Sequence, residues 1–208
     1  MNVENSMKEE PDRRRRAAWA AFGPLKEATD QLRNPEVRAH LFDSTDLPAL
    51  CYGAKTWVDT STTSRILRTT HTALERRLLR HNWHSQYLAG MRSSDLRNLS
   101  HLRDPGEYTS TAKHTWASHI MRKTNDRWTK RTVEWTPREC KRPLGRPPTR
   151  LADVFVNKVN QLYPQLQLFY RSRHETRKHY HARTRPPPWT TIVKERNEWR
   201  MCWCPHNT

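Results

Sequence analysis

Glycine is scarce in this sequence, with only 5 among 208 residues. Loops that wrap phosphate groups and turn-dense β-sandwiches both depend on glycine, so neither is expected. No apolar run approaches the roughly 18 residues that a membrane-spanning helix needs, and the N-terminus MNVENSMKEEPDRRRR lacks the apolar centre of a secretory signal. The four cysteines are too few and too scattered for a disulfide framework, which favours an intracellular protein of the nucleus, the cytoplasm or both.

Apolar side chains are also few. They make up 34% of the residues, and the mean hydropathy is −1.05, whereas globular domains contain about 45–50% apolar residues. Nine tryptophans argue against a disordered chain, because disordered chains are poor in aromatic residues. The sequence therefore predicts a folded protein with a thin core.

Positive charge dominates the composition, with 38 basic and 21 acidic residues and a formal net charge of +17. Residues 1–100 carry 16 basic and 12 acidic residues, a net +4, whereas residues 101–208 carry 22 and 9, a net +13. Arginine supplies 28 of the basic residues, and its planar guanidinium pairs with phosphate and stacks on bases. This asymmetry favours RNA or DNA as the partner. The alternative is a charge that only keeps the protein in solution.

Apolar residues recur at intervals of three and four along most of the chain, and no alternating strand pattern persists, which predicts an all-α fold. Asn34 and Pro35 are typical of a helix start, and Thr60 or Ser61 is expected to begin the next helix. Further helices are expected at about 105–123, 127–135, 150–163 and 189–203. The first helix is expected at about 12–32, with a bend or an interruption at Gly23–Pro24.

The sequence offers no catalytic or metal centre. Two-metal phosphoryl transfer needs clustered carboxylates, but the aspartates occur singly, and Asp43 and Asp46 share a helical spacing without further acids. Cys202, Cys204 and His206 are spaced more tightly than usual zinc ligands and have no evident fourth ligand. We therefore expect no cofactor and no small-molecule substrate.

Basic residues surround tryptophan between residues 122 and 150, which combines cations for phosphates with a ring on which bases stack. The candidate nucleic-acid-binding residues are Arg122, Lys123, Arg127, Trp128, Lys130, Arg131, Lys141, Arg142, Arg146 and Arg150. The alternative is that Trp128 packs in the core with the charges outside. A second basic run, Arg13–Arg16, points around a helix and cannot direct all four side chains at one ligand.

Five segments occur in an order that resembles a known family. They are RRRRAAWAAFGPLKEATDQL (Arg13–Leu32), LPALCYGAKTW (Leu47–Trp57), AKHTWASHIMRKTNDRWTKRTVEW (Ala112–Trp135), CKRPLGRPPTR (Cys140–Arg150) and ERNEWRMCW (Glu195–Trp203). Together they resemble the C-terminal part of the endonuclease–reverse transcriptase of LINE-type, non-LTR retrotransposons, most closely the RTE-like branch. The resemblance covers most of the chain and is weakest at Gln165–Pro188. Ser118 stands where the family has glycine and Leu151 where it has tryptophan, which indicates a diverged or decaying copy.

The resemblance implies an RNA-directed DNA polymerase whose endonuclease domain and palm, with its metal-binding acids, would precede Met1. No catalytic residue can therefore be carried over to this chain, and the family's Mg²⁺ would belong to the palm. The part that remains would include a helical thumb, which grips the template–primer duplex, and a basic segment that holds element RNA or target DNA.

On this basis we expect a helical thumb-like bundle followed by basic, proline-rich linker segments and short helices. The expected regions are an N-terminal tail (1–12), a helical thumb-like region (13–103), a basic helical region with the GRPPTR turn (104–163), an Arg/His/Pro-rich linker (164–188), and a short C-terminal helix with a tail (189–208). Three functions stay open: a nucleic-acid-binding module, a decaying or domesticated open reading frame without activity, and, least expected, a free-standing enzyme.

Overall fold

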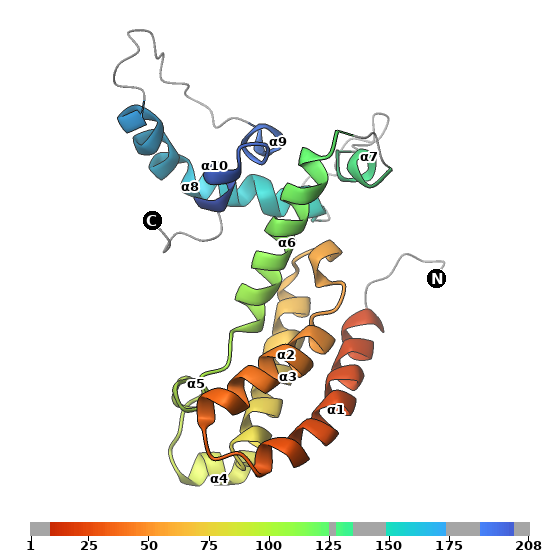
Figure 1. The fold of residues 1–208 in the computed structure, drawn as a ribbon, viewed down its shortest axis with the longest axis vertical. Coiled ribbons are helices and arrows are strands. Elements are labelled where there is room, and N and C mark those ends of the chain that lie inside the picture. Colours follow the sequence, from red (N-terminus) through yellow and green to blue (C-terminus); the bar gives the residue numbers. More distant parts are fainter. Residues whose placement is uncertain (1–8, 125–127, 135–148, 174–187, 202–208) are drawn as a thin grey trace. The chain divides into compact units, whose positions relative to one another are not determined.

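The computed structural model describes residues 9–124, 128–134, 149–173 and 188–201. The chain divides into two compact units, Met1–Thr109 and Ser110–Thr208. Every regular element within the described ranges is a helix, which confirms the all-α prediction (Figure 1). None of these helices is long and apolar enough to cross a membrane.

The described part of the first unit contains α1 (Glu9–Asp30), α2 (Pro35–Leu50), the short 3₁₀ helix η1 (Ala54–Thr56), α3 (Ser61–Leu78), α4 (Trp83–Leu88) and α5 (Ser93–Ser100). Helix α6 (Pro105–Arg122) begins in this unit and continues in the second. The second unit also contains α7 (Trp128–Glu134), α8 (Leu151–Arg173), α9 (Trp189–Ile192) and α10 (Arg196–Met201).

Side-chain caps begin α2 and α3 where the sequence predicts them. The Asn34 side chain accepts a hydrogen bond of 2.8 Å from the backbone N–H of Glu36, and Pro35 is the first residue of α2. The Thr60 hydroxyl accepts one of 3.1 Å from the backbone N–H of Thr63. Each cap satisfies an N–H group that the first turn of a helix leaves unpaired.

The prediction that Gly23–Pro24 could interrupt the first helix is wrong. Helix α1 runs from Glu9 to Asp30 with Pro24 inside it. Proline removes one N–H donor, so the carbonyl of Ala20, four residues earlier, loses its helical partner. Ala20, Gly23 and Pro24 are all exposed, so solvent can hydrogen-bond to that carbonyl and the helix continues.

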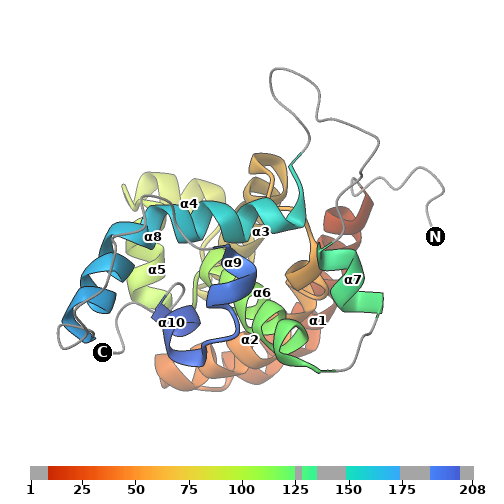
Figure 2. The ribbon, with the colours of Figure 1, turned by 90° about the horizontal axis from the view of Figure 1, so that it is seen from above.

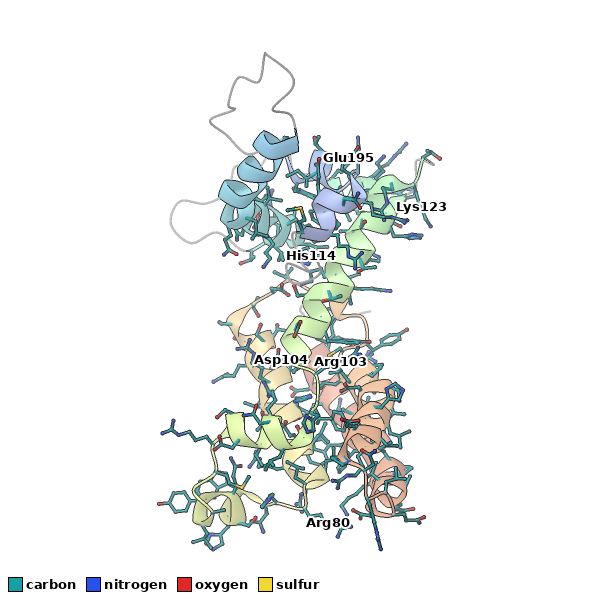
Figure 3. The ribbon with its side chains drawn as sticks, turned by 60° about the vertical axis from the view of Figure 1, so that its left-hand side comes forward. Arg80, Arg103, Asp104, His114, Lys123 and Glu195 are labelled. Atoms are coloured by element: carbon teal, nitrogen blue, oxygen red, sulfur yellow. The ribbon has the colours of Figure 1, made fainter. Side chains whose placement is uncertain are left out.

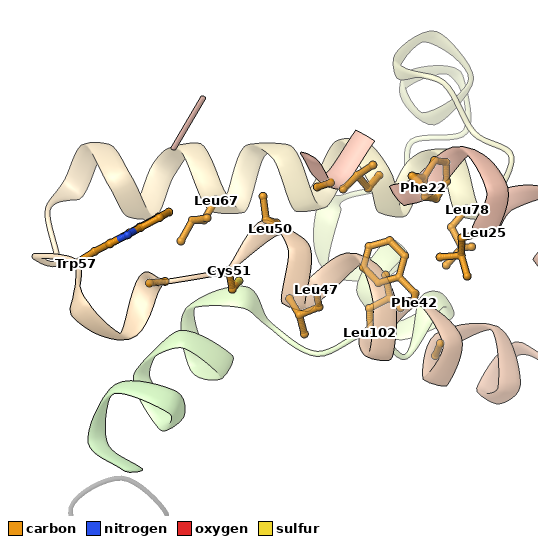
Figure 4. Packing of buried hydrophobic residues seen from close by; sticks show 14 residues of the cluster. Phe22, Leu25, Phe42, Leu47, Leu50, Cys51, Trp57, Leu67, Leu78 and Leu102 are labelled. Carbon is orange, nitrogen blue, oxygen red and sulfur yellow. The ribbon is translucent and has the colours of Figure 1, made fainter. Parts of the chain in front are cut away.

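Phe42 lies at the centre of the first hydrophobic core. Its side chain is fully buried, and its ring meets Phe22 of α1 and His71 of α3 edge to face, at centroid distances of 6.4 and 5.6 Å. Figure 4 shows the buried side chains around it, including Leu47 and, farther along, Trp57. Helices α1, α2 and α3 therefore share one core, and their basic residues remain outside it.

A buried carboxylate connects α3 to α5. Glu75 accepts a hydrogen bond of 2.5 Å from the Ser100 hydroxyl and lies 3.8 Å from the Arg97 guanidinium. Arg97 also pairs with Asp104 at 2.8 Å, and Asp104 accepts a hydrogen bond from the backbone N–H of Gly106 at the start of α6. A Cβ at Gly106 would lie 2.9 Å from that carboxylate, so glycine allows the close approach. This chain of contacts fixes where α6 begins.

Trp199 of α10 lies at the centre of the second core. It is 1% exposed, and its indole N–H donates a hydrogen bond of 2.8 Å to the backbone carbonyl of His114 in α6. Its ring lies 5.8 Å from Phe155 of α8 and 6.2 Å from Trp189 of α9. Helices α9 and α10 therefore pack with α6 and α8 around these rings (Figure 2).

Helix α8 extends farther than the sequence predicted. It continues to Arg173, so residues 164–173 are helical and the linker expected at 164–188 is wrong for that stretch. The stretch contains Leu166, Leu168 and Phe169, and an apolar, leucine-containing sequence favours a helix over a solvated linker. Residues 174–187, the rest of the expected linker, lie outside the described residues.

Asp46 predicts a specific pH dependence of stability. The residue is fully buried in α2, one carboxylate oxygen has no hydrogen-bond partner in the described structure, and burial raises its pKa to about 7. The folded state therefore retains a proton that the unfolded state releases, so this residue lowers the free energy of unfolding as the pH rises from about 4 to about 7. The substitution Asp46→Asn removes that effect. In urea unfolding, the free energy of unfolding of the variant should rise relative to that of the native chain between about pH 5 and about pH 8. A stability difference that is equal at both pH values would contradict the assignment.

Candidate nucleic-acid interface

The structure describes part of the predicted interface. Six of the candidates lie within the described ranges, namely Arg122, Lys123, Trp128, Lys130, Arg131 and Arg150. The other four, Arg127, Lys141, Arg142 and Arg146, lie outside them.

Arg122 and Lys123 lie at the C-terminal end of α6 (Lys123 is labelled in Figure 3). Cations are favourable there because the last turn of a helix carries partial negative charge on its unpaired carbonyls. The preceding residue, Met121, is 2% exposed and packs in the second core. Burial of Met121 therefore anchors the helix end, and the exposed Arg122 extends into solvent.

Trp128, the first residue of α7, is 78% exposed. Val133 of the same helix packs against the second core. These two residues are five positions apart, which separates them by roughly 140° around a helix, so one faces outward when the other faces inward. The alternative in which Trp128 packs in the core is therefore excluded.

Arg131 accompanies this exposed ring. Its guanidinium carbon lies 6.0 Å from the centroid of the Trp128 ring, a cation–π contact worth about 0.5–1 kcal/mol at an exposed site. A flat ring and a cation thus occupy one surface of α7. A nucleotide offers the complementary pair, a base face and a phosphate.

Arg150 lies directly before α8. Its backbone N–H donates a hydrogen bond of 2.8 Å to the carboxylate of Asp153, which reaches back to satisfy the start of the helix. Helices α7 and α8 are in contact. The outer surface of α7 and the start of α8 therefore belong to the same unit, and Arg150 is half-buried there.

Three arginines of the four-arginine run in α1 pair with carboxylates of their own helix. Glu10 lies 3.3 Å from Arg13 and 2.6 Å from Arg14, and Asp12 lies 3.2 Å from Arg15. A phosphate would have to compete with these carboxylates for the same guanidinium groups. This run is therefore a weaker candidate than its charge indicates.

The two helix-spaced aspartates lie in different surroundings. Asp46 is buried, whereas Asp43 lies 3.5 Å from the guanidinium of Arg103. No group of three or more His, Cys, Asp or Glu side chains that could hold a metal ion occurs in the part of the chain that the structure describes. The Cys202–His206 cluster lies outside that part.

Helix α4 presents an exposed aromatic pair that the periodicity of the sequence does not predict. Trp83 and Tyr87 are 69% and 71% exposed, and their rings stack with centroids 5.8 Å apart and planes 11° apart. A spacing of four residues places both on one side of a helix. Two features of the sequence could have indicated this pair: the four-residue spacing of its rings, and a surrounding segment, residues 76–92, that contains four arginines and no acid.

The exposed and buried tryptophans should differ sharply in their effect on stability. Trp199→Phe removes the donor to the buried carbonyl of His114, which should lower the free energy of unfolding by about 1–3 kcal/mol. The matched change Trp128→Phe should alter it by no more than about 0.5 kcal/mol, because that ring is exposed. Urea unfolding followed by circular dichroism measures both. Equal losses would show that the second core is not centred on Trp199.

The sequence is 35% identical over 199 residues to a protein of Caenorhabditis elegans that is named as transposon-derived. The aligned region covers 96% of this chain and 65% of that relative, so the chain spans a little under two thirds of the relative's length. No protein-family description matches the sequence. No solved structure matches it either. The similarity to the nematode protein supports a transposon origin for this chain.

Proposed function

We propose that this chain is the nucleic-acid-binding C-terminal part of a LINE-type retrotransposon reverse transcriptase of the RTE-like branch. In this role it grips the template–primer duplex, element RNA or target DNA without containing the catalytic palm. The observation that carries the proposal is the exposed Trp128 ring with Arg131 over it, in a segment whose sequence resembles that family. The similarity to a transposon-derived protein supports the same origin.

The proposed contact is dominated by phosphate groups. Cations between residues 122 and 150 neutralise phosphates and release the counterions condensed on the strand. Pro143, Pro147 and Pro148 fix one backbone dihedral each, so this segment loses less conformational entropy when it binds. Phosphate contacts carry no base information, so we expect binding that is largely independent of sequence.

Replacing Arg142, Arg146 and Arg150 together by alanine should weaken binding to duplex and single-stranded oligonucleotides. It should also flatten the dependence of log K on log salt by up to about 3 units, since about one counterion is released per phosphate contact. Fluorescence anisotropy at several salt concentrations measures both quantities.

The matched control removes the same number of charges from α1. Arg13, Arg15 and Arg16 are exposed, and the first two already pair with carboxylates, so alanine at these three positions should change the salt dependence less. If the first triple variant binds with unchanged affinity and salt dependence, the site lies elsewhere. If the native chain itself does not bind, the alternative of a decaying or domesticated open reading frame without activity replaces the proposal; Ser118 and Leu151, which depart from the family pattern, favour that alternative.

The purified chain should add no nucleotides to a primer. Phosphoryl transfer by this family depends on metal ions held by clustered carboxylates, and the resemblance assigns those acids to the palm. A primer-extension assay with Mg²⁺ measures this. Nucleotide addition that a chelator abolishes would instead make the chain a free-standing enzyme.

A further inference from the structure

Helix α4 contributes nothing to the core of the first unit, because none of its residues is buried. Local polar contacts nevertheless stabilise the helix at both ends. Asn82 and Ser85 cap each other reciprocally, with hydrogen bonds of 2.7 and 2.9 Å. The Gln86 side chain donates a hydrogen bond of 3.0 Å to the carbonyl of Met91, in the turn that follows the helix. Helix α4 therefore lies on the surface, and its large side chains do not contribute to the core.

The two rings on this helix stay in water although each could stabilise the fold by burial. Trp83 and Tyr87 are about 70% exposed, and Leu88 beside them is 71% exposed. Exposed aromatic groups that gather on one surface are typical of binding sites. The rings are nearly parallel, and their 5.8 Å centroid separation leaves no room for a base between them. A planar ligand would stack on their outer faces.

Basic residues flank this aromatic pair in the sequence. Residues 76–92 contain Arg76, Arg77, Arg80 and Arg92, with two histidines and no acid. Figure 3 labels Arg80, which precedes α4 and lies 3.3 Å from Asp30 of α1. That aspartate also pairs with Lys26 at 2.7 Å, so two cations share this one carboxylate.

We propose that Trp83 and Tyr87 form a stacking site for the bases of an unpaired nucleic-acid strand, whose phosphates meet the exposed Arg77, Arg80 and Arg92, which flank the pair in the sequence. The charge complementarity selects this occupant: a polyanion with exposed flat rings matches a cationic surface with exposed flat rings. A duplex matches it less well, because its base faces are covered by their neighbours. The inference rests on the proposed function, since it adds a second contact for the same class of partner.

The test uses the full chain, with both aromatic residues changed to alanine. The probe is a fluorescein-labelled oligothymidylate of about 12 nucleotides, and the readout is anisotropy. The variant W83A/Y87A should bind at least about 5-fold more weakly than the native chain, because losing one base stacked on an aromatic ring costs at least about that factor. Its salt dependence should stay unchanged, because no phosphate contact is removed. The conservative variant W83F/Y87F should retain most of the affinity.

Two controls separate base stacking from phosphate binding and from unspecific apolar contact. An abasic oligonucleotide of the same length has phosphates but no bases, so the native chain and W83A/Y87A should bind it equally. The substitution Leu88→Ala removes another exposed apolar side chain from α4 and should leave binding of oligothymidylate unchanged.

The outcomes distinguish this inference from the proposed function. If W83A/Y87A binds oligothymidylate as tightly as the native chain while the variant lacking Arg142, Arg146 and Arg150 binds weakly, the stacking site is wrong and the proposed function stands. If Leu88→Ala weakens binding as much as the double variant, or if the double variant only abolishes self-association in sedimentation, α4 is a protein-contact surface and the inference fails. If the native chain binds neither probe, both proposals fail.

Discussion

The large excess of positive charge restricts what this chain can bury. With 38 basic residues and 34% hydrophobic residues, each unit packs a small core around a few large rings, and in the first unit most of the other buried residues are leucine and alanine. Phe42 in the first unit and Trp199 in the second are almost completely buried, and each contacts a buried histidine. Burial lowers the pKa of His71 to about 4, so this histidine is neutral in the folded protein at neutral pH and brings no further charge into the core.

The same restriction explains the contact chain from α3 to α6. A carboxylate such as Glu75 can be buried when a hydroxyl donates to it and a guanidinium lies nearby, as Ser100 and Arg97 do. Arg97 in turn satisfies Asp104, which holds the first N–H groups of α6. The charges of Glu75 and Asp104 are thus compensated locally, and exposed cations such as Arg122 lie where an external anion can meet them.

Local chemistry could be predicted from the sequence, because each part depends on neighbouring residues. The caps at Asn34 and Thr60 involve contacts within three residues, and the amphipathic period of α3 follows from its own sequence. The continuation of α1 through Pro24 could not be predicted, because it depends on which side of the helix faces solvent. The helical stretch at 164–173 was missed because the composition of the longer segment outweighed its few apolar residues.

The candidate site was predicted only in part. The sequence gives the positions of the tryptophans in their helices, but it does not tell which of them other helices bury. Trp199 is buried because α6, α8 and α9 supply rings and a carbonyl around it, whereas Trp128 lies opposite the buried side of its helix. The exposure of the aromatic pair in α4 likewise results from the absence, within the described ranges, of a helix packed over it. Exposure is a property of the assembled unit, and it is the exposed rings that make a nucleic-acid partner physically reasonable.

The proposed role depends on contact between nucleic acid and residues 122–150. Ultraviolet cross-linking of the full chain to a single-stranded oligonucleotide, followed by mapping of the cross-linked peptides by mass spectrometry, tests it directly. We expect cross-links to peptides that contain Trp128 and to the basic segment that ends at Arg150. Cross-links confined to the four-arginine run of α1, or none above the level given by an unrelated basic protein, would contradict it.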